Sequence, residues 1–170
     1  VSLGMVSSYN KASGSPFIEA RMHVNHMSPV RVIKTAIKEA GTEGVTIMDS
    51  PPGTSCPFVQ TVDTADYVLL VTEPTPFGLS DLKQSVDTIK TMNKKYGVII
   101  NRADIGDNGV KDYLKEEKIP LLTEINYDPA IARAYSEGRL ASDDNETIAG
   151  LLTELADKII SDHGTGSNKR

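Results

Sequence analysis

Two short apolar runs constrain the fold of this chain most strongly. Tyr67–Thr72 reads YVLLVT and Gly97–Asn101 reads GVIIN. Continuous apolar runs rich in β-branched residues are typical of strands that are buried on both faces. Between the two runs, apolar residues recur at helical spacing, at Leu79, Leu82, Val86, Ile89 and Met92. A strand, a helix and a second buried strand in this order predict part of a parallel sheet.

The same alternation of strands and helices extends in both directions along the chain. The sequence predicts an α/β fold in three layers, in which a mainly parallel sheet carries helices on both faces. For the last helix, Asp143 is the expected N-cap, with Glu146 three residues later in a capping box. The remaining predicted elements are a helix over Val30–Ala40, a strand over Val45–Met48, a helix over Val110–Glu117, a strand from Pro120 and a helix over Ala130–Tyr135.

Three segments are expected along the chain. Residues 1–27 form a poorly legible N-terminal segment, in which only Phe17–Val24 has the character of a strand. Residues 28–162 carry the alternating pattern and are predicted to form the domain. Residues 163–170 are expected to be a disordered tail, because small and polar residues follow the last helix.

Composition excludes several classes of function. The formal net charge is −5, from 18 Lys and Arg against 23 Asp and Glu, so no broad nucleic-acid surface is expected. Cys56 is the only cysteine, which rules out an internal disulfide or an iron–sulfur cluster held within the chain and favours a cytoplasmic protein. The apolar runs are too short to span a bilayer, and the last helix lacks a basic amphipathic face, so no membrane partner is expected.

Unusual residues follow three of the predicted strands, and at one of them, Glu73–Gly78, the two prolines are also typical of a plain loop. Asp49 ends the run Val45–Met48 and stands before Pro51, Pro52 and Gly53. A strand-end carboxylate can orient a water molecule on Mg²⁺, although on spacing alone this pattern is more typical of a plain turn. Asn101 ends the second apolar run, and its amide could read the edge of an adenine base, yet by itself it is also typical of a turn.

Four stretches follow one another along the chain: DSPPGTSCP from Asp49, VTEPTPFG from Val71, IINR from Ile99 and INYDPAI from Ile125. Taken together, they resemble consecutive signatures of the MinD/ParA/Mrp family of P-loop ATPases. The resemblance is nearest to the MinD-like ATPases that carry an inserted ferredoxin domain, and it spans about residues 28–140.

The resemblance implies a role for each of these stretches. Asp49 would belong to the Mg²⁺ shell through water, as a Walker B-like catalytic residue. Asn101 would contact adenine. The loop beside the base would consist of Asn126, Tyr127 and Asp128, and the switch II loop would consist of Pro51, Pro52, Gly53 and Thr54.

One departure from the family pattern limits what the chain can do alone. The sequence contains no Gly-Lys dipeptide, so we expect a C-terminal portion that lacks the P-loop and does not hydrolyse ATP by itself. ATP and Mg²⁺ would bind the complete protein, and iron–sulfur clusters could lie only in an upstream domain. The absent P-loop strand should leave a sheet edge that either recruits a second copy or is filled by Phe17–Val24.

The expected function is a nucleotide-dependent switch in a homodimer, coupled to an iron–sulfur or electron-transfer protein. Two alternatives remain open. A non-catalytic protein-interaction domain could use the same fold, and it would not need to bind adenine nucleotide. A ligase of the dethiobiotin-synthetase type shares the scaffold, but it would need a substrate pocket that the sequence does not identify.

Overall fold

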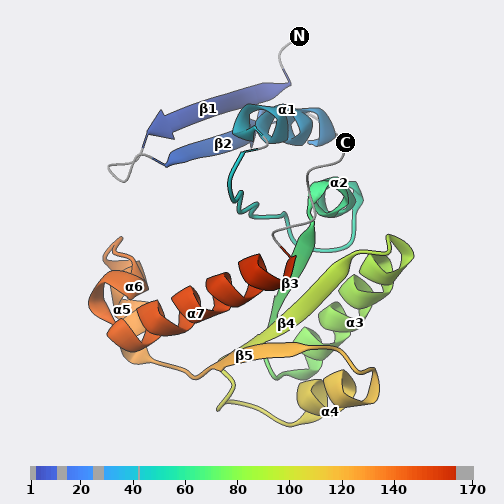
Figure 1. Ribbon diagram of the computed structural model, residues 1–170, viewed down its shortest axis with the longest axis vertical. Coiled ribbons are helices and arrows are strands. Elements are labelled where there is room, and N and C mark those ends of the chain that lie inside the picture. Colours follow the sequence, from blue (N-terminus) through green and yellow to red (C-terminus); the bar gives the residue numbers. More distant parts are fainter. Residues whose placement is uncertain (1–2, 11–14, 25–28, 42, 164–170) are drawn as a thin grey trace. The chain divides into compact units, whose positions relative to one another are not determined.

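The computed structural model describes residues 3–10, 15–24, 29–41 and 43–163. The chain divides into two compact units, one ending at Ala65 and the other beginning at Asp66 (Figure 1). Each unit has its own sheet. The extent of the domain expected over residues 28–162 stays a prediction. The last helix ends at His163, and the remainder of the predicted tail lies outside the described residues.

The first unit contains a two-stranded antiparallel sheet and two helices. Strands β1 (Gly4–Asn10) and β2 (Pro16–Met22) pair in a continuous register, from Gly4 opposite Met22 to Asn10 opposite Pro16. Helix α1 (Val30–Ala40) packs on this sheet, and α2 (Cys56–Thr64) packs on α1. The strand expected within Phe17–Val24 is therefore present. It pairs with β1 and does not extend the parallel sheet.

Close packing of α1 on β1 depends on Gly4. A Cβ atom at this position would lie 2.9 Å from Cγ2 of Val32 and 2.4 Å from the carbonyl oxygen of Arg21. Both distances are too short for carbon, so a larger residue would push the helix or the partner strand away. Val32 is the buried residue of α1, so this contact belongs to the small core of the unit.

The strand predicted over Val45–Met48 does not form. Residues 45–50 have no regular secondary structure, and 66% of Val45 and 92% of Ile47 are exposed. The prediction was wrong because an isolated apolar run becomes a strand only where it can pair with neighbours. In the described part of this unit, the two strands pair with each other.

The second unit contains a parallel sheet in the order β3-β4-β5 (Figure 1). Its strands are β3 (Tyr67–Thr72), β4 (Lys95–Asn101) and β5 (Leu121–Ile125). Helices α3 (Pro76–Thr91) and α4 (Gly109–Glu116) lie on one face, and α7 (Glu146–His163) lies on the other. The short helices α5 (Pro129–Ser136) and α6 (Ala141–Asp144) connect β5 to α7. This arrangement confirms the predicted α/β class with a parallel sheet flanked by helices.

The core of the second unit is centred on β4. Val98 and Ile100 are fully buried and Ile99 is 4% exposed, so both faces of the central strand are covered as predicted. The same prediction was wrong for β3, in which Leu69 is 40% and Val71 61% exposed. β3 is an edge strand of this sheet, and only the face that contacts α3 is buried.

The last helix begins differently from the prediction. The side-chain oxygen of Asn145 accepts a hydrogen bond from the amide of Ile148 at 3.1 Å, which makes Asn145 the N-cap of α7. Asp143, the predicted cap, instead lies in the short helix α6. At the other end of α7, the rings of His163 and Tyr67 stack with centroids 4.3 Å apart, which ties α7 to the start of β3.

Candidate functional site

The candidate site lies where the three parallel strands end, because their carboxyl ends meet at one edge of the sheet. Hydrogen bonds connect the loops that follow these strands. The amide of Asp107 donates to the carbonyl of Pro74 at 3.2 Å, and the amide of Ala103 donates to that of Ile125 at 3.0 Å. The carboxylate of Asp104 accepts a hydrogen bond from the amide of Tyr127 at 2.6 Å. The loop after β4 is thus bound to both of its neighbours.

Asn101 occupies the end of the central strand. It is half-buried and lies opposite Ile125 in the register of β4 and β5. No described residue forms a hydrogen bond with its side-chain amide. Asn101 lines an open cavity of about 430 Å³, together with residues of β3 and of the first turns of α3. Its donor and its acceptor are therefore both available to a ligand.

This cavity has an acidic lining. The carboxylates of Glu73 and Asp81 line it, alongside Thr75 and Ser85. Asp81 has no ion-pair partner in the described part of the chain, whereas Oε1 of Glu73 lies 3.6 Å from Nε of Arg102. Negative charge at this position disfavours a phosphate group but allows a neutral base or a cation.

Arg102 was not singled out by the sequence, yet it contacts two of the three loops. Its guanidinium carbon lies 5.7 Å from the centroid of the Tyr127 ring, in addition to the ion pair with Glu73. Its backbone has φ of +52°, an uncommon conformation for a residue other than glycine. The only signal in the sequence was its position immediately after Asn101.

The three residues predicted beside the base have different surroundings. Asn126 is exposed, and Tyr127 is 44% exposed with its amide held by Asp104. Asp128 is the N-cap of α5, where Oδ1 accepts from the amide of Ala130 at 2.8 Å. Its other oxygen accepts from Asn145 at 2.9 Å. Both oxygens of Asp128 thus already accept hydrogen bonds within the protein.

The predicted metal and switch residues belong to the first unit. Asp49 is exposed and follows a segment without regular structure. Gly53 has φ of +85°, with no atom near its open Cβ position. The role of the loop Pro51–Thr54 as a switch stays a prediction. Among the described residues, no group of three or more His, Cys, Asp or Glu side chains could hold a metal ion. The expectation that Asp49 and Asn101 belong to the same nucleotide site stays a prediction.

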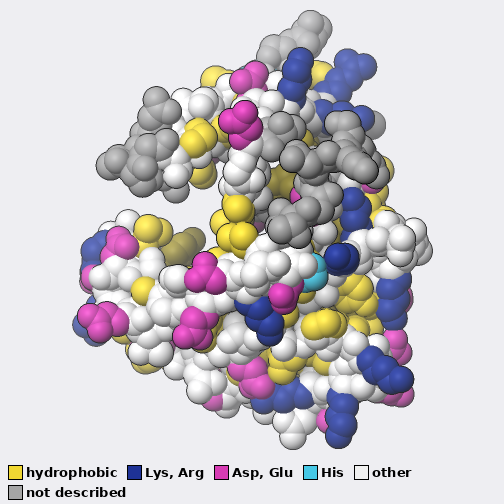
Figure 2. Space-filling view, in the orientation of Figure 1, with side chains coloured by type: hydrophobic (Ala, Val, Ile, Leu, Met, Phe, Trp, Pro, Cys, Tyr) yellow, Lys and Arg dark blue, Asp and Glu magenta, His cyan; other side chains and the backbone are white. Residues whose placement is uncertain are grey.

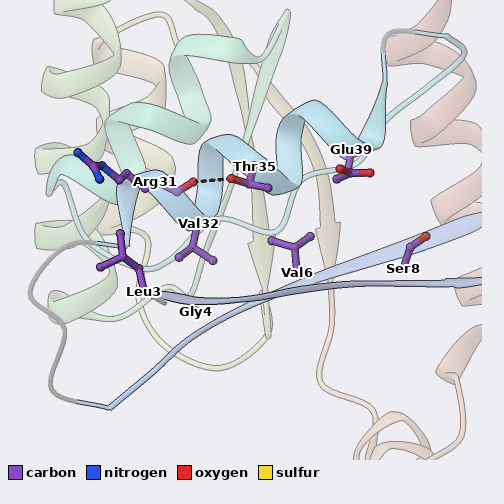
Figure 3. A pocket seen from close by; sticks show the side chains of 8 residues that line it. All are labelled: Leu3, Gly4, Val6, Ser8, Arg31, Val32, Thr35 and Glu39. Atoms are coloured by element: carbon purple, nitrogen blue, oxygen red, sulfur yellow. Dashed lines mark hydrogen bonds between the residues drawn. The ribbon is translucent and has the colours of Figure 1, made fainter. Parts of the chain in front are cut away.

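A second cavity, of about 540 Å³, lies between β1 and α1 in the first unit (Figure 3). Figure 3 shows the Val6 side chain extending from β1 toward α1 and that of Val32 extending from α1 toward β1, whereas Arg31 points away. The hydroxyl of Thr35 is occupied by a hydrogen bond to the carbonyl of Arg31 at 3.0 Å. With apolar side chains at its centre, this cavity resembles a gap in packing more than a catalytic site.

Charge on the surface is mixed. On the face shown in Figure 2, Lys and Arg side chains of the second unit are scattered among Asp and Glu. Two ion pairs of this unit connect Lys90 of α3 to Glu117, which follows α4, at 2.7 Å and Lys111 of α4 to Glu124 of β5 at 2.6 Å. The hydrogen bond from Lys90 lowers the pKa of Glu117. None of the described helices has the length and hydrophobicity of a membrane span.

A likeness in fold to one solved structure supports the assignment of the sheet. The MinD cell division protein of Aquifex aeolicus superposes with a TM-score of 0.53 at 23% identity, over 65% of this chain and 51% of that chain. The chain has a MinD-like α/β fold. At this identity the likeness concerns the fold alone.

Curated relatives match in sequence. One uncharacterized protein of Methanocaldococcus jannaschii is 34% identical over 116 residues, which cover 68% of this chain and 39% of that protein. A second uncharacterized protein of this organism is 25% identical over 154 residues, which cover 89% of the chain and 53% of the relative. The cytosolic Fe-S cluster assembly factor NUBP1 homolog of Caenorhabditis elegans is 25% identical, over 75% of the chain and 49% of the relative.

These matches cover only part of each relative. The chain spans about half of the length of each of these curated relatives, or less. No known family model matches it.

Proposed function

We propose that the chain is the base-recognising part of a P-loop ATPase domain of the MinD/ParA/Mrp kind. In this proposal the complete protein binds ATP and Mg²⁺ and works as a nucleotide-dependent switch. The MinD-like fold supports it, as does the order of the four sequence signatures along the chain. The observation that carries it is the free amide of Asn101 at the end of the central strand, where it lines an open cavity. The exposed Tyr127 lies in the loop after β5, the strand that pairs with β4.

The chemistry of Asn101 suits a purine base. An amide has one acceptor and two donor hydrogens, so it can pair with the donor and acceptor at the edge of adenine. Tyr127 supplies an aromatic ring in the neighbouring loop, and base–aromatic stacking contributes about 1–3 kcal/mol per base. Both residues lie at the carboxyl edge of the sheet, where parallel α/β proteins bind their ligands.

The phosphate groups would bind elsewhere in the complete protein. Glu73 and Asp81 line the cavity near Asn101, and their charge would repel phosphate. A P-loop supplies backbone amides and a lysine to compensate phosphate charge, but this sequence has no Gly-Lys dipeptide. We therefore expect the chain to bind adenosine weakly and not to hydrolyse ATP.

Asp49 would act on Mg²⁺ in the complete protein. Mg²⁺ keeps most of its water and needs only one or two carboxylates, so a single exposed carboxylate without a described partner suits this role. Mg²⁺ would neutralise phosphate charge, and Asp49 would orient a water molecule bound to it. Asp49→Asn should keep the fold but lower ATP turnover of the complete protein by orders of magnitude. A near-normal rate at saturating Mg²⁺ would remove Asp49 from the site.

The output of the switch is also part of the proposal. A relative that matches 75% of this chain is named as a cytosolic Fe-S cluster assembly factor. That name supports coupling of nucleotide binding to an iron–sulfur or electron-transfer protein in the cytoplasm. The switch II loop Pro51–Thr54 would respond to the nucleotide and alter contacts within a homodimer.

Titration of the purified chain followed by NMR tests the proposal. Adenosine, ATP and GTP are added separately to isotope-labelled protein, and amide shifts are followed residue by residue. We expect adenosine to bind in the millimolar range and to shift signals around Asn101 and Tyr127. ATP should bind no more tightly than adenosine, because its phosphates lack their binding loop. Shifts confined to other surfaces, or none at all, would contradict the proposal.

A protein-interaction domain is a second candidate, favoured by the exposed apolar residues near the edge of the parallel sheet. Val71 is 61% and Phe77 85% exposed, and such surfaces often mark contacts between proteins. The expected occupant is a second copy of the chain. Sedimentation should then show a dimer that Val71→Lys converts to a monomer. A monomeric wild-type chain at all concentrations would exclude it.

A further inference from the structure

Arg102 adopts a strained backbone at the end of the central strand. Its φ of +52° places it in the left-handed region, where Asn and Gly are favoured over a long side chain. The turn keeps Asn101 in register with Ile125 and returns the amide of Ala103 to the carbonyl of the same Ile125. Such outliers concentrate at functional sites, where the surrounding structure holds them in place.

The side chain of Arg102 joins the loops of the two outer strands. Glu73, in the loop after β3, lies 3.6 Å from the guanidinium Nε. Tyr127, in the loop after β5, lies below the guanidinium, with 5.7 Å between Cζ and the ring centroid. The backbone of Tyr127 is fixed by Asp104 from the same β4 loop. Tyr127 is thus held twice, at its amide and at its ring.

We propose that Arg102 is a positioning residue for base recognition: with Glu73 as its anchor, it holds the Tyr127 ring at the carboxyl edge of the sheet, in the loop next to the strand that ends at Asn101. This inference rests on the proposed function, because it assigns a role within the same base site. The guanidinium covers part of the ring, and 44% of Tyr127 remains exposed for stacking. Nε of Arg102 lies 3.6 Å from Oε1 of Glu73, so the carboxylate attracts the guanidinium without a hydrogen bond.

The ion pair between Arg102 and Glu73 also affects the preference for adenine over guanine. A free guanidinium pairs readily with the two acceptors of guanine, O6 and N7. Because the ion pair with Glu73 competes with such pairing, it favours reading of the base by the amide of Asn101. Glu73 therefore acts against guanine, although it does not touch the base itself.

Stability alone does not explain this arrangement. Both Arg102 and Glu73 are about half exposed, and exposed ion pairs contribute little to folding. A glycine at this position would adopt the left-handed backbone without strain. Arg102→Gly should therefore leave the unfolding midpoint unchanged or raise it, while it weakens binding. A loss of affinity without a loss of stability indicates a positioning role, whereas a loss of both indicates a structural role.

The experiment combines stability and binding measurements on the full chain, with adenosine and guanosine as probes. Arg102→Gly should weaken adenosine binding by about two- to five-fold, the range of an exposed cation–π contact. Arg102→Lys should restore less than the full affinity, because an ammonium lacks the planar face that stacks on a ring. Glu73→Gln should shift the preference toward guanosine, since the guanidinium is released.

A double-mutant cycle shows whether Arg102 acts through Tyr127. In a Tyr127→Leu background, Arg102→Gly should have no further effect on adenosine affinity. Equal losses in both backgrounds would overturn the inference, as would an unchanged affinity of Arg102→Gly in a wild-type chain that binds adenosine. If the wild-type chain binds no adenosine, the proposed function fails and this inference fails with it. Arg102→Lys keeps the test decisive if the glycine variant does not fold.

Discussion

Asn145 donates a hydrogen bond from Nδ2 to Oδ2 of Asp128 over 2.9 Å, and each of these residues caps a helix. Asp128 caps α5 through its other oxygen, and Asn145 caps α7 through its own side-chain oxygen. The link therefore fixes the start of the last helix relative to the loop that follows β5. Since Tyr127 precedes Asp128, the position of the proposed base loop depends on this pair of caps.

Removing the Asp128 carboxylate should cost stability. Loss of an N-cap costs about 0.5–2 kcal/mol, and Asp128→Ala also leaves the Asn145 amide without its acceptor. We expect a loss near the upper end of this range in urea-induced unfolding. Asp143→Ala is the matched control, because Asp143 is exposed in α6 and should change the free energy of unfolding by less than about 0.5 kcal/mol. Equal effects of both variants would contradict the assigned cap.

Gly106 should tolerate no side chain. It has φ of +125°, and a Cβ atom would lie 2.0 Å from the carbonyl oxygen of Pro74. Gly106→Ala should therefore push the β3 and β4 loops apart and cost about 1–3 kcal/mol. As a control, Gly150 lies inside α7 with nothing within 4 Å of its Cβ position, and Gly150→Ala should gain about 0.5–1 kcal/mol. Thermal unfolding should show a lower midpoint than wild type for Gly106→Ala and a higher midpoint for Gly150→Ala.

The ion pair between Lys90 and Glu117 predicts a dependence of stability on pH. The hydrogen bond from Lys90 holds the pKa of Glu117 below its ordinary value of 4.5. A carboxylate with a lowered folded pKa stabilises the fold above its ordinary pKa, and this contribution is lost as the pH falls through the folded pKa. The effect should be small and screened by salt, because both side chains are exposed.

Glu117→Gln should flatten the acid side of this profile in urea titrations at a series of pH values. Glu116→Gln, at an exposed position without a described ion pair, should leave the slope unchanged. If the two variants have the same profile below neutral pH, the ion pair does not contribute.

The pattern of apolar residues predicted β4 correctly, but it did not predict the burial of β3 or the absence of a strand over Val45–Met48. The apolar run of β4 predicted a strand with two buried faces because β4 is central in its sheet. The equally apolar run of β3 occupies an edge, and the run Val45–Met48 has no strand beside it among the described residues. Which strands become neighbours depends on pairing between distant segments, and this cannot be read from either run.

The residues of the candidate site also differ in how far the sequence could predict them. Asn101 could be placed at a ligand-binding edge from its position after a buried strand. The role of Arg102 could not, because its contacts come from Glu73 and Tyr127 in two other loops. For Asp128 a signal was present, since an aspartate before Pro129 at the first helical position is typical of an N-cap. The resemblance to the family instead implied that Asp128 belongs to the loop beside the base.

Asn101→Ala tests base recognition most directly. The side chain has no described hydrogen-bond partner in the protein, so its removal should leave the unfolding free energy nearly unchanged. In the complete protein, ATP affinity should fall by about 1–3 kcal/mol, because polar edges of the base lose their partner. The preference for ATP over GTP should narrow at the same time, since the amide is the group that distinguishes the two edges.

The control for this variant is an asparagine at the other end of β4. Asn93 precedes β4 and has φ of +52°, so Asn93→Gly removes an amide without straining the backbone. Calorimetric titration should give wild-type ATP affinity for Asn93→Gly and weaker binding for Asn101→Ala. If Asn101→Ala retains both the affinity and the base preference, the amide does not read the base. Tyr127 and the loop beside it would then have no established partner at this edge, and the interaction domain would become the better description of the chain.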